Sequence, residues 1–390
     1  MTATVAVRRA APTADRRLLT AVFAVLGAVM AVFGARMPAV QAAADLGPGR
    51  LAVVLFAAAA GMVAGLRLGS RLADRHGPSR LLVGPAAVFG GALALLGQCT
   101  GWGGLMLMAL VFGLAHGLLD VGVNCAAVNV QRAYGRPIMA GLHACYSLGA
   151  LAGAAVAALS TSFSHRTLFA VVGVLTALAA LAAVPLLPTA RHLDGPGPGA
   201  ELADGDGEDV SSSAGRRAVW LLGALAAACL LGEGAAADWA AVHLRSLEAS
   251  ERTAAVSYAL YSAAMAAGRL SGDRLIARFG APAVVRAGAA IAAAGLGAGV
   301  MAGSAPAALL GWMAFGLGLS TAVPSLITAA GRGGPRAVGA VAATGYVGLL
   351  LGPAVIGALA SLLSLSAALA LPVALAAVVA VLAYRSLETR

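Results

Sequence analysis

Charged side chains are scarce in this chain, and lysine is absent from it. Only 11% of the 390 residues are charged and 60% are hydrophobic, whereas a soluble domain carries about 25% charged residues. So few charges cannot cover a surface that faces water, which excludes an ordinary soluble protein. The composition predicts a polytopic membrane protein, for which lipid is the solvent around most of the outer surface.

Cysteines and enzyme motifs are scarce as well. The four cysteines lie singly in apolar runs, without a CxxC pair or a Cys/His cluster, so we interpret them as packing residues. The sequence contains no GxxxxGK[ST] phosphate-binding loop, which excludes ATP-driven transport within this chain. No nucleophile–base spacing points to an enzyme, and we expect neither a metal nor a cofactor.

Apolar runs long enough to cross a bilayer, about 20 residues each, occur twelve times. They span residues 18–37, 51–70, 81–99, 104–130, 138–160, 167–187, 217–237, 253–275, 282–302, 305–329, 337–360 and 364–384. Arg16-Arg17 before the first run and AVQAAA after it also fit a cleaved signal, but we interpret this run as a retained span. The sequence therefore predicts an all-α membrane protein with twelve transmembrane helices.

The arginines predict the orientation. With the N-terminus in the cytoplasm, 21 of the 26 arginines fall on the cytoplasmic side, as the positive-inside rule requires. Both termini are then cytoplasmic, in a multi-pass protein of the cell inner (plasma) membrane. The net charge of +10 mainly reflects this topology, and no basic run with interleaved aromatic residues supports a nucleic-acid partner.

A polar segment divides the chain into two halves. Residues 188–216 are rich in Gly, Pro, Ser and acids, and we predict a disordered cytoplasmic linker there. The predicted units are therefore the tail 1–17, a six-helix bundle 18–187, the linker, a second six-helix bundle 217–384 and the tail 385–390. Asp74, Gly149 and Gly153 recur 199 residues later as Asp273, Gly348 and Gly352, which indicates that the two bundles are pseudo-repeats.

The stretch GSRLADRHGPSR, residues 69–80, joins the second and third predicted spans. An acid at the end of a helix can pair with arginines or with a neighbouring helix N-terminus, although an ordinary positive-inside loop would look similar. We predict a conformational latch that holds one arrangement of the two halves. Its residues are Gly69, Asp74, Arg75, Gly77 and Arg80, with Asp273 and Arg274 in the second copy.

This loop resembles the signature loop of the major facilitator superfamily, which lies between spans two and three. Twelve spans in two halves and a weaker second copy after span eight agree with that family, so the resemblance extends from Leu18 to Tyr384. GLLDVGVNCAAVNV and MAGLHACYSLGALAG look like the branch of the fucose–proton symporter and its uncharacterised bacterial relatives. The resemblance implies a secondary transporter that works by alternating access.

Three positions carry the likeness to that branch. Asp120 and Asn124 match an acid and an Asn in span four, and His143 matches a polar residue in span five. The segment EGAAADWAAVHLR, residues 233–245, also looks like span seven of these relatives. Span one lacks the second functional acid of the fucose symporter. Uptake of a sugar-like solute and export of a metabolite or drug therefore both stay open.

Asp120 is the only charge between residues 104 and 130. It lies twelve residues before Arg132, hence roughly 18 Å from the cytoplasmic edge at 1.5 Å per residue. An ionised carboxylate facing lipid at that depth would cost at least about 2.5 kcal/mol, so Asp120 must face the bundle interior. A carboxyl group there can gain and lose a proton as its surroundings change, which predicts proton coupling; the alternative is a purely structural hydrogen bond between helices.

Further residues complete the candidate site. His116 lies one turn before Asp120 and could be a relay or a core histidine, and Glu233, about five residues from the predicted end of span seven, could couple protons or snorkel to water. Ordinary core packing would explain the aromatic candidates equally well. The candidates for the substrate cavity are Asn124, His143, Tyr146, Tyr258, Tyr261, Trp312 and Tyr346.

The sequence thus predicts a proton-coupled secondary transporter that moves a small organic solute. Its predicted partners are that solute, protons and the lipid bilayer. We expect it to act as a monomer. The alternative from another class is a transporter-like sensor or channel without coupled flux. A long structured cytoplasmic domain would favour this alternative, and the sequence predicts none.

Overall fold

The computed structural model describes residues 13–190, 192–195 and 213–388. Most of the predicted N-terminal tail, the linker from 196 to 212 and the last two residues therefore lie outside the described residues. Every regular element in the described part is a helix.

The first half contains six long helices and one short 3-10 turn. They are α1 (Thr13–Ala43), α2 (Pro48–His76), α3 (Arg80–Gln98), α4 (Trp102–Tyr134), α5 (Met139–Leu159), α6 (His165–Ala182) and η1 (Val184–Thr189). The second half is more broken. It consists of α7 (Ser213–Ser246), α8 (Glu251–Phe279), α9 (Ala281–Met301), α10 (Ala305–Leu319), α11 (Ala322–Ala330), η2 (Gly331–Gly333), α12 (Gly334–Leu362), α13 (Leu365–Ala368) and α14 (Ala370–Leu387).

Ten segments of the described chain are long and apolar enough to cross a membrane. One of them, Ala305–Leu362, contains α10, α11, η2 and α12. The ten do not include α8, which carries six charged residues. The chain is therefore a multi-pass, all-helical protein, in which each of the twelve predicted spans coincides with one helix or with two consecutive helices.

Helices pair in the same way in both halves. In the first half α1 packs on α5, α2 on α4 and α3 on α6; in the second half α7 packs on α12, α8 on α10 and α9 on α14. Glycines allow the close approach. A Cβ atom on Gly149 or Gly153 of α5 would collide with the backbone of α1, and one on Gly348 or Gly352 of α12 would collide with the backbone of α7.

The predicted span 305–329 is interrupted between α10 and α11 at Ser320 and Thr321. Pro324 explains the break, because it has no N–H to donate to the Ser320 carbonyl and its ring crowds that carbonyl. Ser320 instead donates its hydroxyl to the Leu317 carbonyl at 2.7 Å. Gly268 of α8 lies directly against Ser320, so α8 approaches the break closely.

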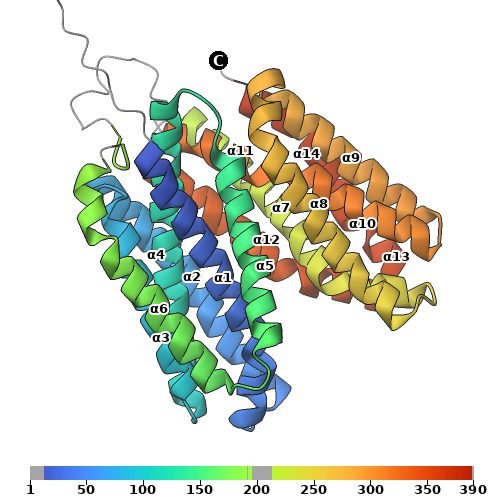
Figure 1. Cartoon of the computed structure of the whole chain (residues 1–390). Coiled ribbons are helices and arrows are strands. Elements are labelled where there is room, and N and C mark those ends of the chain that lie inside the picture. Colours follow the sequence, from blue (N-terminus) through green and yellow to red (C-terminus); the bar gives the residue numbers. More distant parts are fainter. Residues whose placement is uncertain (1–12, 191, 196–212, 389–390) are drawn as a thin grey trace, which may run out of the picture.

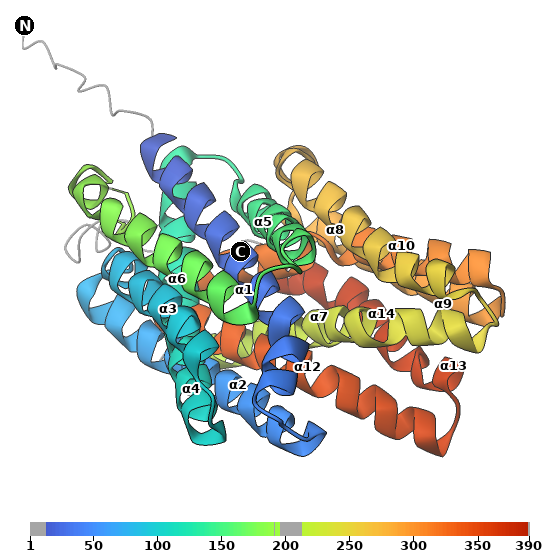
Figure 2. The ribbon, with the colours of Figure 1, turned by 60° about the horizontal axis from the view of Figure 1, so that its bottom comes forward.

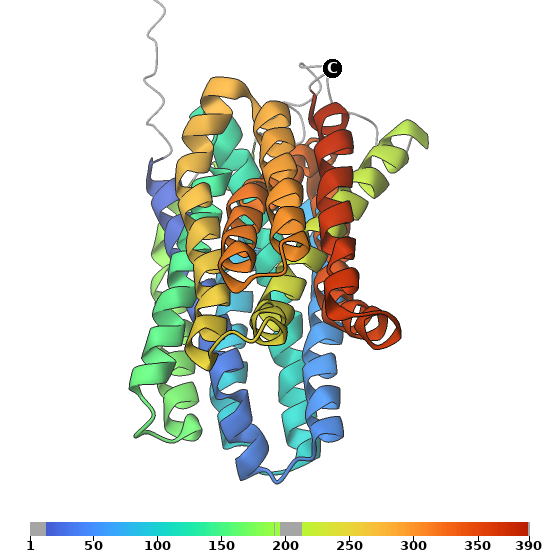
Figure 3. The same cartoon turned by 90° about the vertical axis from the view of Figure 1, so that its right-hand side faces the viewer.

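Figure 1 shows the two halves as neighbouring bundles, with α1–α6 on one side, α8–α10 and α14 on the other, and α11 and α12 behind the middle. Figure 2 shows the bundles from another direction. The start of α1 and the end of α14 lie at the same end of the molecule (Figure 3), which we call the terminal face. The bundles lie closest there and diverge toward the opposite end (Figure 1). Between them, α2 packs on α12 and α5 packs on α8.

The first residues of the predicted linker are folded onto the terminal face. Leu193 is buried, and its carbonyl accepts a hydrogen bond from Asn129 Nδ2 at 2.9 Å. Asp194 accepts hydrogen bonds from the Ser79 backbone N–H at 2.8 Å and from its hydroxyl at 2.7 Å. The prediction of a disordered linker is therefore wrong for residues 192–195, because Leu193 supplies an apolar anchor and Asp194 binds the start of α3.

Candidate functional site

Two acids of the predicted latch join the bundles at the terminal face. Asp74 at the end of α2 forms an ion pair with Arg336 at the start of α12, with 2.9 Å between Oδ2 and Nε. The side chains are 36% and 62% exposed. Water therefore screens this pair strongly, and such surface pairs contribute about 0–1 kcal/mol.

Asp273 makes the second connection in a different way. Its Oδ1 accepts from the Ala140 N–H at 3.0 Å and its Oδ2 from the Gly141 N–H at 2.9 Å. These N–H groups belong to the first turn of α5, where Ile138 offers no side-chain cap. Asp273 thus caps a helix of the other bundle, a position that favours a carboxylate. Gly272 permits the approach, since a Cβ there would lie against Ala140 and Thr321.

The other predicted latch residues surround these contacts. Gly69 packs against Leu118 of α4, and Gly77, with φ of +83°, lies against the Asp194 carboxylate. The exposed members are Arg75, Arg80 and Arg274. The structure therefore brings the two acids and the glycines into helix contacts, whereas these three arginines lie at the surface.

Asp120 is buried near the middle of α4. Tyr346 of α12 donates a long hydrogen bond to Asp120 Oδ1, with 3.4 Å between the oxygens. Asn124 donates its Nδ2 to the Asp120 backbone carbonyl at 2.9 Å. Asp120 thus faces the other bundle and accepts a hydrogen bond from a hydroxyl of that bundle.

The two histidines lie on either side of this carboxylate. The His116 ring packs against Phe89 and Tyr346, with ring centroids 5.5 and 6.4 Å apart, and its Nε2 atom is buried without a hydrogen-bond partner. His143 Nε2 lies 3.3 Å from Asn124 Oδ1. The structure therefore connects Asp120 to His143 through Asn124, while His116 contacts the tyrosine that binds Asp120.

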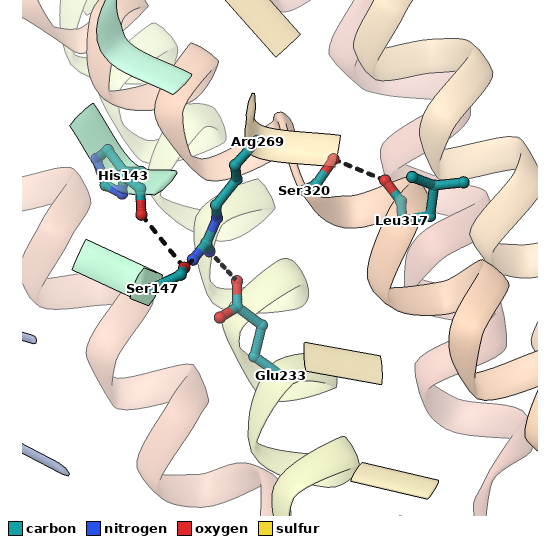
Figure 4. A network of polar contacts seen from close by, with 6 residues as sticks. All are labelled: His143, Ser147, Glu233, Arg269, Leu317 and Ser320. Atoms are coloured by element: carbon teal, nitrogen blue, oxygen red, sulfur yellow. Dashed lines mark hydrogen bonds and ion pairs between the residues drawn. The ribbon is translucent and has the colours of Figure 1, made fainter. Parts of the chain in front are cut away.

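A buried ion pair lies between the bundles beside this group (Figure 4). Arg269 of α8 donates from Nη1 to Ser147 Oγ of α5 at 2.6 Å, and its Nη2 lies 3.5 Å from Glu233 Oε1 of α7. Ser147 in turn donates to the His143 carbonyl at 3.2 Å. Polar contacts thus run from Glu233 through Arg269 and Ser147 to the residues around Asp120.

Sequence reasoning missed Arg269 and placed it among the cytoplasmic arginines that set the orientation. That assignment is wrong, because its side chain is 8% exposed and α8 continues ten residues beyond it. Arg269 lies four residues before Asp273, so both share one helix face. This spacing was the available signal that Arg269 faces the other bundle as Asp273 does.

Glu233 also lies deeper than its predicted span suggested. We expected it about five residues from the end of span seven, where a side chain can reach water. The helix continues nine residues past residue 237, to Ser246, since Asp238, His243 and Arg245 are accommodated within it. Glu233 therefore lies inside the helix, beside Arg269, with its side chain 19% exposed.

The aromatic candidates fall into two groups. Tyr146 and Tyr346 both lie close enough to Asp120 and Glu233 for their hydroxyl groups to interact with the charges of these acids. They therefore belong to the region between the bundles. Trp312 does not, because it is fully buried and donates to His243 Nδ1 inside the C-terminal bundle at 3.3 Å. In this arrangement Trp312 packs inside the C-terminal bundle, and its role in the cavity stays a prediction.

Tyr258 and Tyr261 stack on each other along α8, with ring centroids 5.9 Å apart. Tyr258 is exposed, whereas Tyr261 is buried against Gly316 and Phe315. The Tyr261 hydroxyl has no hydrogen-bond partner. Both rings lie within electrostatic range of Glu233 and Arg269.

Two carboxylates and one guanidinium between apolar helical bundles can bind a polar solute and exchange protons with it. The described residues contain no group of three or more His, Cys, Asp or Glu side chains that could hold a metal ion. Buried ionisable side chains between two bundles of apolar helices are typical of membrane transporters.

The chain belongs to the Major Facilitator Superfamily, whose family profile matches residues 18–336. It is therefore a secondary membrane transporter and not an enzyme. It is 32% identical to an uncharacterised MFS-type transporter of Yersinia pestis over 340 residues, which cover 85% of each chain. It is 31% identical to the uncharacterised transporter y4wD of Sinorhizobium fredii, over 88% of this chain and 92% of that protein.

Solved transporters share the fold. The fucose:proton symporter FucP of E. coli superimposes with a TM-score of 0.73 at 16% identity, over 97% of this chain and 100% of that one. The proton:xylose symporter XylE superimposes with a TM-score of 0.74 at 12% identity, over 97% and 96%. The family resemblance inferred from the sequence is thus confirmed, and these structural likenesses establish the fold.

Proposed function

We propose that the protein is a proton-coupled symporter for a small organic solute. It has twelve transmembrane helices in two pseudo-repeated six-helix bundles, which alternately open to either side of the membrane. It lies in the cell inner membrane with both termini in the cytoplasm and works as a monomer. The names of the fold neighbours FucP and XylE, both proton symporters, support symport over export.

The repeat is supported by the helix pairing. Equivalent helices pack together in each half, and the glycines that recur 199 residues apart lie at equivalent contacts, α5 on α1 and α12 on α7. The arginine distribution favours a cytoplasmic location for the terminal face, and the latch contacts at that face would then hold the cytoplasmic ends together. The described arrangement then corresponds to the outward-facing state of the transporter.

The buried carboxylate of Asp120 is the observation that carries the proposal for proton coupling. One of its side-chain partners, Tyr346, belongs to the other bundle, so motion of the bundles would change its surroundings. Desolvation favours a protonated carboxyl group, whereas water or a cation favours the anion. A carboxyl group whose surroundings alternate in this way can bind a proton on one side and release it on the other.

The test compares pH-gradient-driven accumulation with solute exchange in proteoliposomes that contain a pH-sensitive dye. A panel of sugars, amino acids and carboxylates first identifies a solute whose entry carries protons in the wild-type protein. Asp120→Asn should then lower pH-gradient-driven accumulation of that solute well below the wild-type level, because this side chain no longer carries a proton. Exchange of labelled for unlabelled solute should persist, since it needs no net proton movement.

Asp238→Asn is the matched control, because Asp238 is an exposed acid of α7 and its replacement should leave both modes unchanged. Wild-type-like driven accumulation in Asp120→Asn would refute proton coupling through this residue. Loss of exchange together with driven flux would show that Asp120 is needed for binding or folding instead.

A further inference from the structure

The Arg269 guanidinium is incompletely paired although it is buried. Arginine carries five N–H donors, and the described partners are Ser147 on Nη1 and Glu233 on Nη2. Its Nε atom is buried without a hydrogen-bond partner. The Glu233 contact, at 3.5 Å, is longer than the roughly 2.7–2.9 Å of a strong charge-assisted hydrogen bond. The guanidinium therefore has unused capacity to bind another oxygen acid.

We infer that Arg269 binds the carboxylate of a small organic anion, and that Glu233 takes up a proton when this anion replaces it as the partner of the guanidinium. This inference rests on the proposed function, for which it names the substrate class. In the solute-free site the ionised Glu233 balances the Arg269 charge. In the loaded site the substrate carboxylate balances it, and Glu233 is neutral.

Charge balance is the physical reason for coupling the two events. A second carboxylate beside an ionised Glu233 would repel it, because like charges in a partly desolvated site oppose each other. A protonated Glu233 without an anion would leave a buried arginine unpaired, which is also unfavourable. Anion and proton therefore bind together, with the proton coming from the same aqueous side as the anion.

The neighbouring groups are compatible with this exchange. The ionisable groups within electrostatic range of Glu233 are Arg269, Tyr258 and Tyr261 on α8, Tyr346 on α12, Tyr146 on α5 and Cys229 on α7. Neither α10 nor α11 carries an ionisable side chain, and those of α14, Tyr384 and Arg385, lie near its end at the terminal face. Arg269 is thus the only fixed cation in this set.

Location also favours a substrate role. Arg269 contacts Ser147 across the boundary between the bundles (Figure 4), and alternating-access transporters bind their substrates at this kind of boundary. Glu233 is the more exposed of the two partners, at 19% against 8%, and is therefore the more accessible to a proton. Asn124 and His143, joined to Ser147 through the His143 carbonyl, offer hydrogen-bonding groups for the rest of the solute.

The experiment measures binding to the purified full-length protein in nanodiscs by calorimetry. The probes are acetate, lactate and benzoate, each paired with its neutral amide of similar shape. The wild-type protein should bind at least one carboxylate and none of the amides. Because binding takes up one proton, the dissociation constant should fall by up to about tenfold for each unit by which the pH is lowered.

Variants separate the roles of the two side chains. Glu233→Gln mimics the protonated acid and should bind the carboxylates without pH dependence. Arg269→Lys keeps the charge but not the planar fork and should bind more weakly, whereas Arg269→Gln should not bind. The double variant Glu233→Gln/Arg269→Gln contains no uncompensated charge, so it provides a folded reference without binding where Arg269→Gln alone fails to fold.

Equal binding of amides and carboxylates, or carboxylate binding by the double variant, would overturn the inference. So would wild-type pH dependence of binding in Glu233→Gln. Absence of carboxylate binding in Glu233→Gln would also overturn it, because the Arg269 guanidinium lacks its carboxylate partner in that variant. Asp238→Asn, which changes the exposed acid of α7, should retain the wild-type carboxylate binding and its pH dependence. The binding assay measures no proton flux through Asp120, so failure of proton coupling in the flux assay and failure of the anion site in the binding assay are distinguishable.

Discussion

Replacing Asp273 by Asn should loosen the terminal face more than any other single change to the latch. The carboxylate accepts hydrogen bonds from the Ala140 and Gly141 N–H groups on its two oxygens. Asn retains one acceptor oxygen, but its amide group points an N–H toward the second backbone N–H. The variant therefore loses one charge-assisted hydrogen bond and the negative charge at the N-terminus of α5.

The magnitude follows from these two losses. A hydrogen bond to a charged group contributes about 1.5–3 kcal/mol, and a charge at a helix terminus about 0.3–1 kcal/mol. Partial exposure of Asp273 lowers both, so we expect a loss of about 2 kcal/mol in the closure of the bundles. That corresponds to a fall of about 30-fold in the ratio of closed to open molecules, at about 1.4 kcal/mol per tenfold.

Asp74→Asn is the matched comparison, because Asp74 occupies the equivalent place in the first half. Its ion pair with Arg336 is largely exposed and contributes at most about 1 kcal/mol, which corresponds to a change of about fivefold at most. Spin labels at the exposed positions Arg136 and Arg278 would report the distance between the bundles by pulsed electron resonance. An unchanged distance distribution in Asp273→Asn, or equal shifts in both variants, would refute the capping argument.

Two further predictions concern the orientation of the chain in the membrane and the start of α3. A cysteine that replaces Arg136, beside the start of α5, should react with a membrane-impermeant maleimide only from the cytoplasm. A cysteine that replaces Ser162, between α5 and α6, should react only from outside. The reverse pattern would overturn the proposed orientation. Asp194→Asn should speed amide hydrogen exchange at Ser79 about fivefold, as the loss of about 1 kcal/mol from a hydrogen bond implies. Exchange at the wild-type rate would show that Asp194 does not hold the start of α3.

The positions of the helices were largely predictable because lipid demands long apolar segments. The same rule made Asp120 conspicuous as the single charge in its segment. The ends of the helices were less predictable. Charged residues near a span end could belong to the loop or to the helix, and both α7 and α8 continue past the predicted ends.

Arg269 was hidden for a related reason. An arginine close to the predicted cytoplasmic end of a span satisfies the positive-inside rule, so its sequence position needed no further explanation. Its burial depends on contacts from α5 and α7, which lie far from it in the chain. The partners of Asp273 could not be predicted either, since they are backbone N–H groups of another bundle.

The ion pair of Arg269 and Glu233 is better explained by function than by stability. Burying two charges carries a desolvation penalty that close, well-aligned pairing only roughly offsets. Here the contact is 3.5 Å long and the Nε atom has no partner, so the compensation is incomplete. An apolar pair of similar size would hold α7 and α8 together at least as well. What such a pair could not do is release one partner and accept another, and that exchange is what a transporter needs between its two bundles.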